Sequence, residues 1–345
     1  MSLPTQQRAW ILSNPPAGEI QKDTFELVTR DLPELKDGEI LLQVESLSND
    51  PAQRGWIQKD QDPERAYSPP VQKGDIVRAT GIGKVLKSRS DKWQEGQRVV
   101  GMWGWTDYAI APATAVQFAA IDLPGKPTAS LSVLGMVAVT AYHGLFDVLD
   151  LKPEHAIIVS GAAGAVGSIV VQLAKNVVGA QRVIGIAGGK DKCDWVKSLG
   201  ADDCIDYKEA GWAEKLKAAL PKEGADRVFE NVGGEVLNEI FKVTRRFGKI
   251  ASCGMIAGYN GAAQNLTNVS EIVKNRLVLQ GFIVIDIGAR WPVAVKELAG
   301  WVTEGKIKID GAETLVPAKV DDIPQVWQRL FVGQNRGKLI TQLTN

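Results

Sequence analysis

The chain has 345 residues, which is more than one hydrophobic core usually supports, so its length predicts two domains. Hydrophobic residues make up 45% of the sequence, and 40 basic residues balance 40 acidic ones. This neutral composition gives no overall attraction to nucleic acids or anionic membranes, and we expect neither as a partner.

The start of the chain lacks the basic region and apolar run of a secretory signal, and no apolar run reaches the ~20 residues that span a bilayer. Cys193, Cys204 and Cys253 are odd in number and widely spaced. This pattern favours reduced, buried thiols over a disulfide framework. We therefore expect a cytoplasmic protein without a transmembrane helix.

Residues 1–127 contain short β-rich runs separated by Gly, Pro and Asp, with little helical periodicity. The clearest runs are Ile40–Val44, Gly74–Thr80 and Gln97–Val100. This pattern predicts an irregular β domain.

Residues 128–313 alternate apolar β-rich runs with amphipathic helices, which is typical of an α/β domain with a doubly wound parallel sheet. Residues 314–345 are β-like again around one helix at Ile323–Val332, and we expect them to pack onto the first domain. The expected strands are Ala156–Ser160, Arg182–Ala187, Asp203–Asp206, Asp226–Glu230, Lys249–Ser252 and Leu277–Ile285, and the expected helices lie near 166–178, 190–199, 211–220, 234–246 and 291–304.

A glycine-rich loop follows the first of these strands and opens the next helix. The dinucleotide fingerprint G-x-G-x-x-G is matched with alanine in its first position. The second position lets the backbone approach a pyrophosphate, and the helix N-terminus offers N–H donors to the anion. Such loops also occur for geometry alone, but the strand before and the helix after favour a dinucleotide site. Its expected phosphate-binding positions are Ala162, Gly164, Ala165, Val166 and Gly167.

The next strand, Val183–Ala187, ends in Gly188-Gly189 rather than in the carboxylate that would bind the ribose hydroxyls of NAD. Lys190 and Lys192 follow at once and could contact a 2′-phosphate. The alternative is that both lysines merely cover a solvated helix start, although cations are unfavourable at that end of a helix. We therefore expect NADPH as the cofactor in preference to NADH.

Five further segments occur in order along the chain: LGMVAVTAYHGL (134–145), FENVGG (229–234), CGMIAGYN (253–260), GFIVID (281–286) and GQNRGK (333–338). With the glycine-rich loop they resemble the medium-chain dehydrogenase/reductase superfamily, in its zinc-free prostaglandin reductase, alkenal double-bond reductase and curcumin reductase branch. The resemblance covers essentially the whole chain. It implies a GroES-like β domain joined to a Rossmann domain, with NADPH in the cleft between them.

The resemblance also implies the reaction, which is reduction of a carbon–carbon double bond conjugated to a carbonyl in an enone or enal. Hydride reaches the β-carbon and charge develops on the carbonyl oxygen, where a preorganised donor accelerates the reaction. Tyr259 is the candidate catalytic donor or proton relay. The alternatives are that Tyr259 is an exposed loop residue, or that the nicotinamide ribose hydroxyl does this work.

Carried over by motif, the resemblance assigns further residues to the cofactor and substrate. Lys192 and Tyr207, beside Gly188, would hold the 2′-phosphate; Asn231, Phe282, Ile283, Val284 and Asn335 would line the nicotinamide half, with Tyr259 near the ribose. The family motif DPYMR reads Asp50-Pro51-Ala52-Gln53-Arg54 here, so Ala52 replaces a tyrosine and reshapes the pocket. The expected substrate-pocket residues are Asn49, Ala52, Trp103, Trp105 and His143, although His143 could simply belong to a helix face.

We expect no metal site, because the two histidines, His143 and His155, have no histidine or cysteine at ligand spacing. The resemblance implies a homodimer formed through Rossmann edge strands near Leu277–Ile285, a long apolar strand. Two alternatives remain open for the function. One is a quinone reductase or a trans-acting enoyl reductase of polyketide synthesis, and the other is an NADPH-binding protein without turnover.

Overall fold

In the computed structural model, the described residues are 3–262 and 264–344, and they form two compact units. The first unit contains the chain through Leu131, Thr314–Gln334 and the segment from Leu339 onward. The second unit contains Ser132–Glu313 and Asn335–Lys338. The predicted tail of residues 314–345 is therefore shared between the units rather than belonging wholly to the first.

The first unit is built from two antiparallel sheets. One pairs β1 with β2, and the other has the order β14-β15-β3-β4-β5-β7, with β6 also paired to β3. Its strands are β1 (Gln6–Leu12), β2 (Phe25–Asp31), β3 (Glu39–Ser48), β4 (Thr80–Ser88), β5 (Arg98–Met102), β6 (Tyr108–Pro112), β7 (Val116–Ala119), β14 (Glu313–Ala318) and β15 (Lys338–Leu343), and its α-helices are α1 (Gln53–Trp56) and α9 (Ile323–Gln328). The expected irregular β domain is confirmed.

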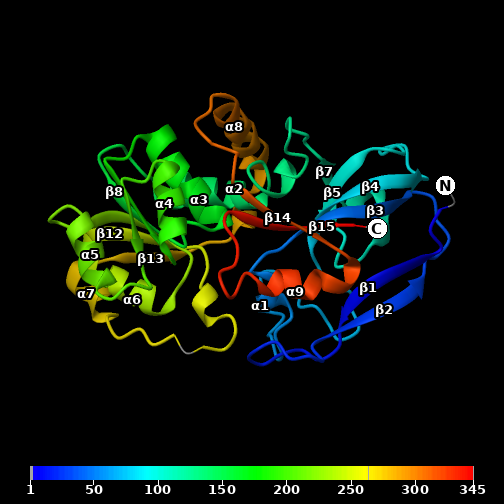
Figure 1. Cartoon of the computed structure of the whole chain (residues 1–345), viewed down its shortest axis with the longest axis horizontal. Coiled ribbons are helices and arrows are strands. Elements are labelled where there is room, and N and C mark those ends of the chain that lie inside the picture. The colour runs from blue at the N-terminus through cyan, green and yellow to red at the C-terminus, as the bar shows by residue number, and fades with distance from the viewer. Residues whose placement is uncertain (1–2, 263, 345) are drawn as a thin grey trace. The chain divides into compact units, whose positions relative to one another are not determined.

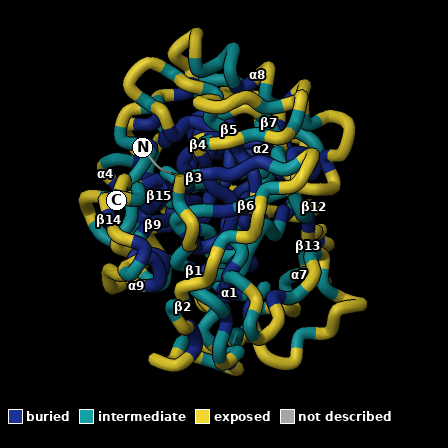
Figure 2. Tube along the Cα trace, turned by 90° about the vertical axis from the view of Figure 1, so that its right-hand side faces the viewer, coloured by how far each residue is buried: buried dark blue, intermediate teal, exposed yellow. Residues whose placement is uncertain are grey.

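An aromatic cluster forms the core of this unit. The Trp105 ring lies 5.0 Å from Phe25 and 5.4 Å from Trp327, measured between ring centroids, and neither tryptophan is exposed. The long central strand β3 is almost entirely buried (Figure 2). One expected β run was wrong: most of Gly74–Thr80 is irregular, and a strand begins only at Thr80.

The second unit contains a six-stranded parallel sheet with the order β10-β9-β8-β11-β12-β13. Numbered along the chain, this is the order 3-2-1-4-5-6 of a Rossmann sheet, so the predicted doubly wound fold is confirmed. Its strands are β8 (Ala156–Ser160), β9 (Arg182–Ala187), β10 (Asp203–Asp206), β11 (Ala225–Glu230), β12 (Thr244–Ser252) and β13 (Val278–Gly281), and its α-helices are α2 (Met136–Tyr142), α3 (Ala165–Gln172), α4 (Lys190–Ser198), α5 (Trp212–Ala219), α6 (Gly234–Val243), α7 (Ser270–Asn275) and α8 (Trp291–Thr303).

Helices cover both faces of this sheet, α3 and α4 on one and α5 and α6 on the other (Figure 1). Apolar side chains of α5 and α6, such as Leu216 and Phe241, form one buried cluster with Ile184 and Val228 of the sheet. Because the central strands β8 and β9 are covered on both faces, they are almost continuously buried rather than alternating.

Four elements differ clearly from the predictions: β12 begins at Thr244 instead of Lys249, α9 ends at Gln328 instead of Val332, and α6 and β13 differ as follows. Helix α6 ends at Val243 and not near residue 246, because Thr244 is already extended and its hydroxyl donates to the Ile240 carbonyl at 2.8 Å. The predicted strand Leu277–Ile285 was too long. It ends at Gly281, and a 3₁₀ segment, Val284–Arg290, begins three residues later.

Candidate functional site

The loop between β8 and α3 has the geometry of a phosphate cradle. Gly161 has a positive φ of 58°, and its carbonyl accepts the Gly164 N–H at 2.9 Å. A Cβ at Gly167 would lie only 2.3 Å from the Gly161 oxygen, so glycine alone allows α3 to start this close to the loop. The start of α3, with Ala165 and Val166 in its first turn, therefore directs its unpaired N–H groups at the space beside the loop.

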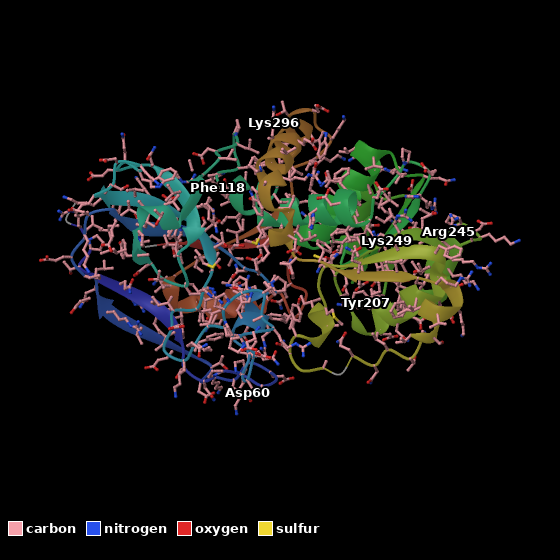
Figure 3. All side chains as sticks on the ribbon, turned by 180° about the vertical axis from the view of Figure 1, so that it is seen from behind. Asp60, Phe118, Tyr207, Arg245, Lys249 and Lys296 are labelled. Atoms are coloured by element: carbon pink, nitrogen blue, oxygen red, sulfur yellow. The ribbon has the colours of Figure 1, made fainter. Side chains whose placement is uncertain are left out.

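The end of β9 packs against the residues that follow β10. A Cβ at Gly188 would lie 2.9 Å from Cε1 of Tyr207 and 3.0 Å from Cε of Lys208. Asp206 joins the two strand ends, because its Oδ1 accepts N–H bonds from Gly189 at 2.9 Å and from Lys208 at 3.0 Å. Tyr207 remains partly exposed and is labelled in Figure 3. The absence of a side chain at Gly188 leaves room for this contact.

The two lysines at the start of α4 have different environments. Lys190 is exposed and forms an ion pair with Asp194 one turn later. Lys192 is more buried, and its pKa is lowered by burial and by the positive charge of Lys208. Lys192 and Lys208 repel each other near the end of β9, which has no acidic residue of its own, and two such cations form a donor set that suits a dianionic phosphate. Of the two lysines, Lys192 therefore fits the predicted role and Lys190 does not.

Asn231 lies beside the phosphate cradle, at the end of β11. Its side-chain amide donates to the Ser160 carbonyl at 2.7 Å, and its backbone N–H donates to the Ser160 hydroxyl at 2.8 Å. A Cβ at Gly161 would meet the Asn231 Cβ at 3.4 Å. The ends of β8 and β11 are thereby tied together where the parallel strands finish, which is the edge at which open α/β sheets bind ligands.

Tyr259 follows a short 3₁₀ turn, Ile256–Gly258, that packs on this same edge. The Ala257 N–H donates to the Val232 carbonyl at 2.9 Å, and the Tyr259 hydroxyl accepts the Met255 N–H at 3.4 Å. The structure thus brings Tyr259 close to the turn after Asn231.

Phe282 continues from β13, and its N–H donates to the Ser252 carbonyl at 3.3 Å. Its ring packs edge-on against Phe229 at 5.8 Å and His143 at 5.5 Å, measured between centroids. Ile283 and Val284 come next at the carboxyl end of the sheet. The ring of His143 is held by Asp147, whose Oδ2 lies 2.8 Å from Nδ1.

The segment around Asn335 returns to the phosphate cradle. The Gly337 N–H donates to the Ala163 carbonyl at 2.9 Å, and the side-chain amide of Asn335 donates to the Gly337 carbonyl at 3.0 Å. Asn335 thus lies two residues from a direct backbone contact with the loop.

The five expected substrate-pocket residues lie in different units, four in the first and His143 in the second. Asn49 is buried and donates to the Thr341 hydroxyl at 2.9 Å, while Ala52 directly precedes α1. Trp103 and Trp105 belong to the hydrophobic core of the first unit. Packing accounts for both tryptophans, and substrate contact by any of the five stays a prediction.

Residues 3–262 and 264–344 contain no group of three or more His, Cys, Asp or Glu side chains that could hold a metal ion. Sequence reasoning missed three residues of the cofactor region: Asp206, Lys208 and Glu230. Asp206 and Lys208 lie in the segment IDYK, on either side of the predicted Tyr207. Their charges next to a predicted cofactor-binding residue could have pointed to them.

This fold and site define a dinucleotide-binding oxidoreductase of the medium-chain type. Residues 8–118 match the model described as the N-terminal domain of oxidoreductase, and residues 165–300 match the model described as zinc-binding dehydrogenase. The chain is 33% identical to the NADPH-dependent curcumin reductase of Escherichia coli, over 98% of this chain and 97% of that protein. It is 32% identical to prostaglandin reductase 1 of Rattus norvegicus, over 98% and 99% of the two chains.

Among solved structures, the fold matches CurA of Vibrio vulnificus in complex with NADPH, with a TM-score of 0.88, 33% identity and coverage of 98% of this chain and 99% of that one. The chain belongs to the curcumin reductase and prostaglandin reductase branch of the medium-chain dehydrogenase/reductase superfamily, as its motifs predicted.

One relative carries a different kind of name. An uncharacterized membrane protein of Saccharomyces cerevisiae is 37% identical over 98% of both chains. Within the described part of the present chain, no helix is long and apolar enough to cross a membrane.

Glu230, the last residue of β11, is a fully buried acid at the centre of this site. Its Oε1 accepts the N–H groups of Val232 at 2.7 Å and Gly233 at 2.6 Å, which fixes the turn that contains Asn231. Burial raises the Glu230 pKa to about 7, against the opposing effects of these two N–H groups and the nearby Ser160 hydroxyl. The other carboxylate oxygen, Oε2, is buried and has no hydrogen-bond partner among the described residues.

The raised pKa predicts how Glu230 affects stability with pH. An ordinary glutamate has a pKa near 4.5, so between about pH 4.5 and 7 the folded chain binds a proton that the unfolded chain has lost. The contribution of Glu230 is therefore full below pH 4.5 and is lost as pH rises through 7. A shift of this size corresponds to about 3 kcal/mol in the free energy of unfolding.

Urea unfolding at pH 5 and pH 8 tests this with Glu230→Gln, which keeps the side-chain shape but cannot titrate. Wild type should lose stability relative to the variant at the higher pH. Glu223→Gln, at an exposed position before β11, is the matched control and should follow wild type at both pH values. Equal pH dependence of wild type and Glu230→Gln would contradict the prediction.

Proposed function

We propose that this protein catalyses the NADPH-dependent reduction of the carbon–carbon double bond in α,β-unsaturated ketones or aldehydes. One observation carries the proposal: a phosphate cradle at Gly161–Gly167 lies in the same unit as Lys192 and Lys208, near the end of a strand, β9, that has no acidic residue of its own. Similarity over the full chain to reductases named for curcumin and prostaglandin supports the substrate class.

In this proposal, different residues of the second unit bind different parts of NADPH. The cradle and the start of α3 take the pyrophosphate, Lys192 and Lys208 neutralise the 2′-phosphate, and Tyr207 covers the strand end at Gly188. The turn after Glu230 and the backbone after Gly281 lie at the carboxyl edge of the sheet, where they would orient the nicotinamide half. When bound, NADPH supplies the hydride that the β-carbon receives.

Charge then develops on the substrate carbonyl oxygen, and a donor directed at this oxygen lowers the barrier. Tyr259 is our candidate for this donor. Its hydroxyl accepts a 3.4 Å hydrogen bond from the Met255 N–H, which places the phenol near the turn after Asn231.

Cofactor oxidation with a small substrate panel tests the proposal. The purified chain is mixed with NADPH, and separately with NADH, and offered an aliphatic 2-alkenal, an aryl enone, a quinone and a saturated aldehyde. We expect NADPH to be oxidised with the alkenal or the enone. Turnover of the quinone alone would indicate a quinone reductase, and tight NADPH binding without any turnover would indicate a binding protein.

Replacing Lys192 tests the cofactor preference. We expect Lys192→Ala to weaken NADPH binding by about tenfold to a hundredfold, the loss of one charge-assisted hydrogen bond, and to leave NADH binding unchanged. Titration of tryptophan fluorescence measures both dissociation constants. Lys190→Ala, which removes the exposed lysine paired with Asp194, is the control and should keep the NADPH affinity. An equal loss for both cofactors would show that Lys192 does not read the 2′-phosphate.

Removing the Tyr259 hydroxyl tests its catalytic role. We expect Tyr259→Phe to lower kcat for an enone by about 10²-fold, as loss of one preorganised donor does, with little change in the dissociation constant of NADPH. Steady-state kinetics beside fluorescence titration separates the two effects. Unchanged kcat would assign the donor role elsewhere.

We further propose that the chain forms a homodimer through β13. This strand is at the edge of the parallel sheet, and its residues, including Val278 and Leu279, are exposed. An apolar edge strand of this kind is prone to pair with another strand. A second copy of the same strand would cover it around a two-fold axis.

Light scattering coupled to gel filtration tests the homodimer. Wild type should have twice the chain mass, and Val278→Lys should shift the mass toward one chain, because lysine on an edge strand opposes pairing. Val332→Lys replaces an exposed valine of the first unit and serves as the matched control. A monomeric wild type at micromolar concentration would contradict the proposal.

A cytoplasmic location is the last part of this proposal. Three free cysteines and dependence on NADPH suit a reducing compartment. Fluorescence microscopy of a tagged full-length chain would test it, and signal confined to membranes would contradict it.

A further inference from the structure

Two of the three cysteines meet beside the proposed 2′-phosphate site. Cys193 lies on α4 and Cys204 lies on β10, and the two elements pack together. The two thiols are near enough for each to shift the pKa of the other. Closing a disulfide of about 2.05 Å would draw the two sulfur atoms together.

The two thiols also line an open cavity of about 620 Å³ at the edge of the sheet. Its walls include Lys190 and Lys197 of α4 and Asp206 of β10, and it lies beside these elements rather than over the phosphate cradle. Cys193 is 5% exposed and Cys204 is 8% exposed. A small, uncharged oxidant can therefore reach sulfur atoms that larger reagents cannot.

The environment makes the two cysteines chemically unequal. The pKa of Cys193 is lowered, first by its interaction with the Cys204 thiol and further by the charge of Lys197, while burial and the charge of Asp206 oppose the shift. Cys193 is also the fourth residue of α4, close to the positive end of the helix dipole. The pKa of Cys204 is raised by that same interaction and by burial. Cys193 is thus the more nucleophilic of the two, and Cys204 is placed to react with it afterwards.

We propose that Cys193 and Cys204 form a reversible disulfide under hydroperoxide and that this disulfide weakens NADPH binding. The Cys193 thiolate attacks one peroxide oxygen, the O–O bond breaks, and a sulfenic acid forms with release of hydroxide, which takes up a proton as water. The Cys204 sulfur then attacks the Cys193 sulfur and displaces the sulfenic oxygen as a second water. Two thiols are oxidised and one hydroperoxide is reduced.

The effect on the cofactor follows from the neighbours of the two cysteines. Lys192 directly precedes Cys193, and the pair Tyr207 and Lys208 follows β10 closely. Drawing α4 toward β10 moves Lys192 relative to Lys208, so the two cations no longer meet the phosphate together. Because the 2′-phosphate is absent from NADH, the disulfide should weaken binding of NADPH and not of NADH. This second part rests on the proposed NADPH site, whereas disulfide formation does not.

Peptide mapping by mass spectrometry tests the first part. The full-length chain is treated with hydrogen peroxide, free thiols are blocked, and the peptides are identified. We expect a Cys193–Cys204 disulfide that dithiothreitol removes, and none in Cys193→Ser or Cys204→Ser. Cys253→Ser is the matched control and should form the disulfide as wild type does. Cys253 is partly exposed as a residue. Burial of its thiol and the charge of Glu230 raise the thiol pKa to about 12, so the thiol is poorly reactive.

Fluorescence titration of the reduced, oxidised and re-reduced chain tests the second part. Oxidation should weaken NADPH binding by about tenfold, leave NADH binding unchanged and be reversed by dithiothreitol. In Cys193→Ser and Cys204→Ser the same treatment should have no effect. Absence of the disulfide in wild type, or unchanged NADPH affinity once it has formed, would overturn the inference. Failure of the reduced chain to bind NADPH would instead overturn the proposed function, while the peptide map would still decide whether the thiols pair.

Discussion

The close approach of α3 to the end of β8 is the contact on which the rest of the site depends. It requires glycine at position 167, because any side chain there would collide with the Gly161 oxygen and the Ala162 backbone. Once α3 starts at this point, the Gly161–Gly164 turn closes and the N–H groups of the helix face one space. Asn231 and Gly337 then bind to this frame from two separate parts of the chain, through the carbonyls of Ser160 and Ala163.

The site holds several charged groups whose environments favour the neutral form. Lys192 is destabilised by burial and by Lys208, and Glu230 by complete burial. Each of these costs folding free energy, and such costs cluster where a protein binds or transforms a ligand. A dianionic phosphate would relieve the strain between the lysines. No such ligand stabilises Glu230. Its carboxylate instead orders the turn after β11 by accepting two backbone hydrogen bonds.

Local sequence was enough to predict the elements around the phosphate loop. Strands β8, β9 and β10 have their predicted bounds, because each has an apolar centre and polar residues or glycine at or just beyond its ends. The start of β12 at Thr244 could not be predicted, because it depends on pairing with β11 in the folded sheet. The strand predicted to extend to Ile285 ends at Gly281 for a related reason. An apolar run in the sequence does not show where its pairing with the adjacent strand, β12, ends. Asp206 and Glu230 were missed because their roles rest on backbone N–H groups that only the folded turn brings within reach.

The chain enters the first unit in three stretches and the second in two. Strand β15, the last strand in chain order among the described residues, pairs with β3 and completes the larger sheet of the first unit. During synthesis on a ribosome, the unit that is translated first is therefore completed last. Until β15 has been made, one edge of β3 is paired only with β6. The second unit lacks only Asn335–Lys338 when β14 emerges, so it can fold before the unit that precedes it. Loss of the residues from Asn335 onward would remove few residues but would take part of the structure from both units.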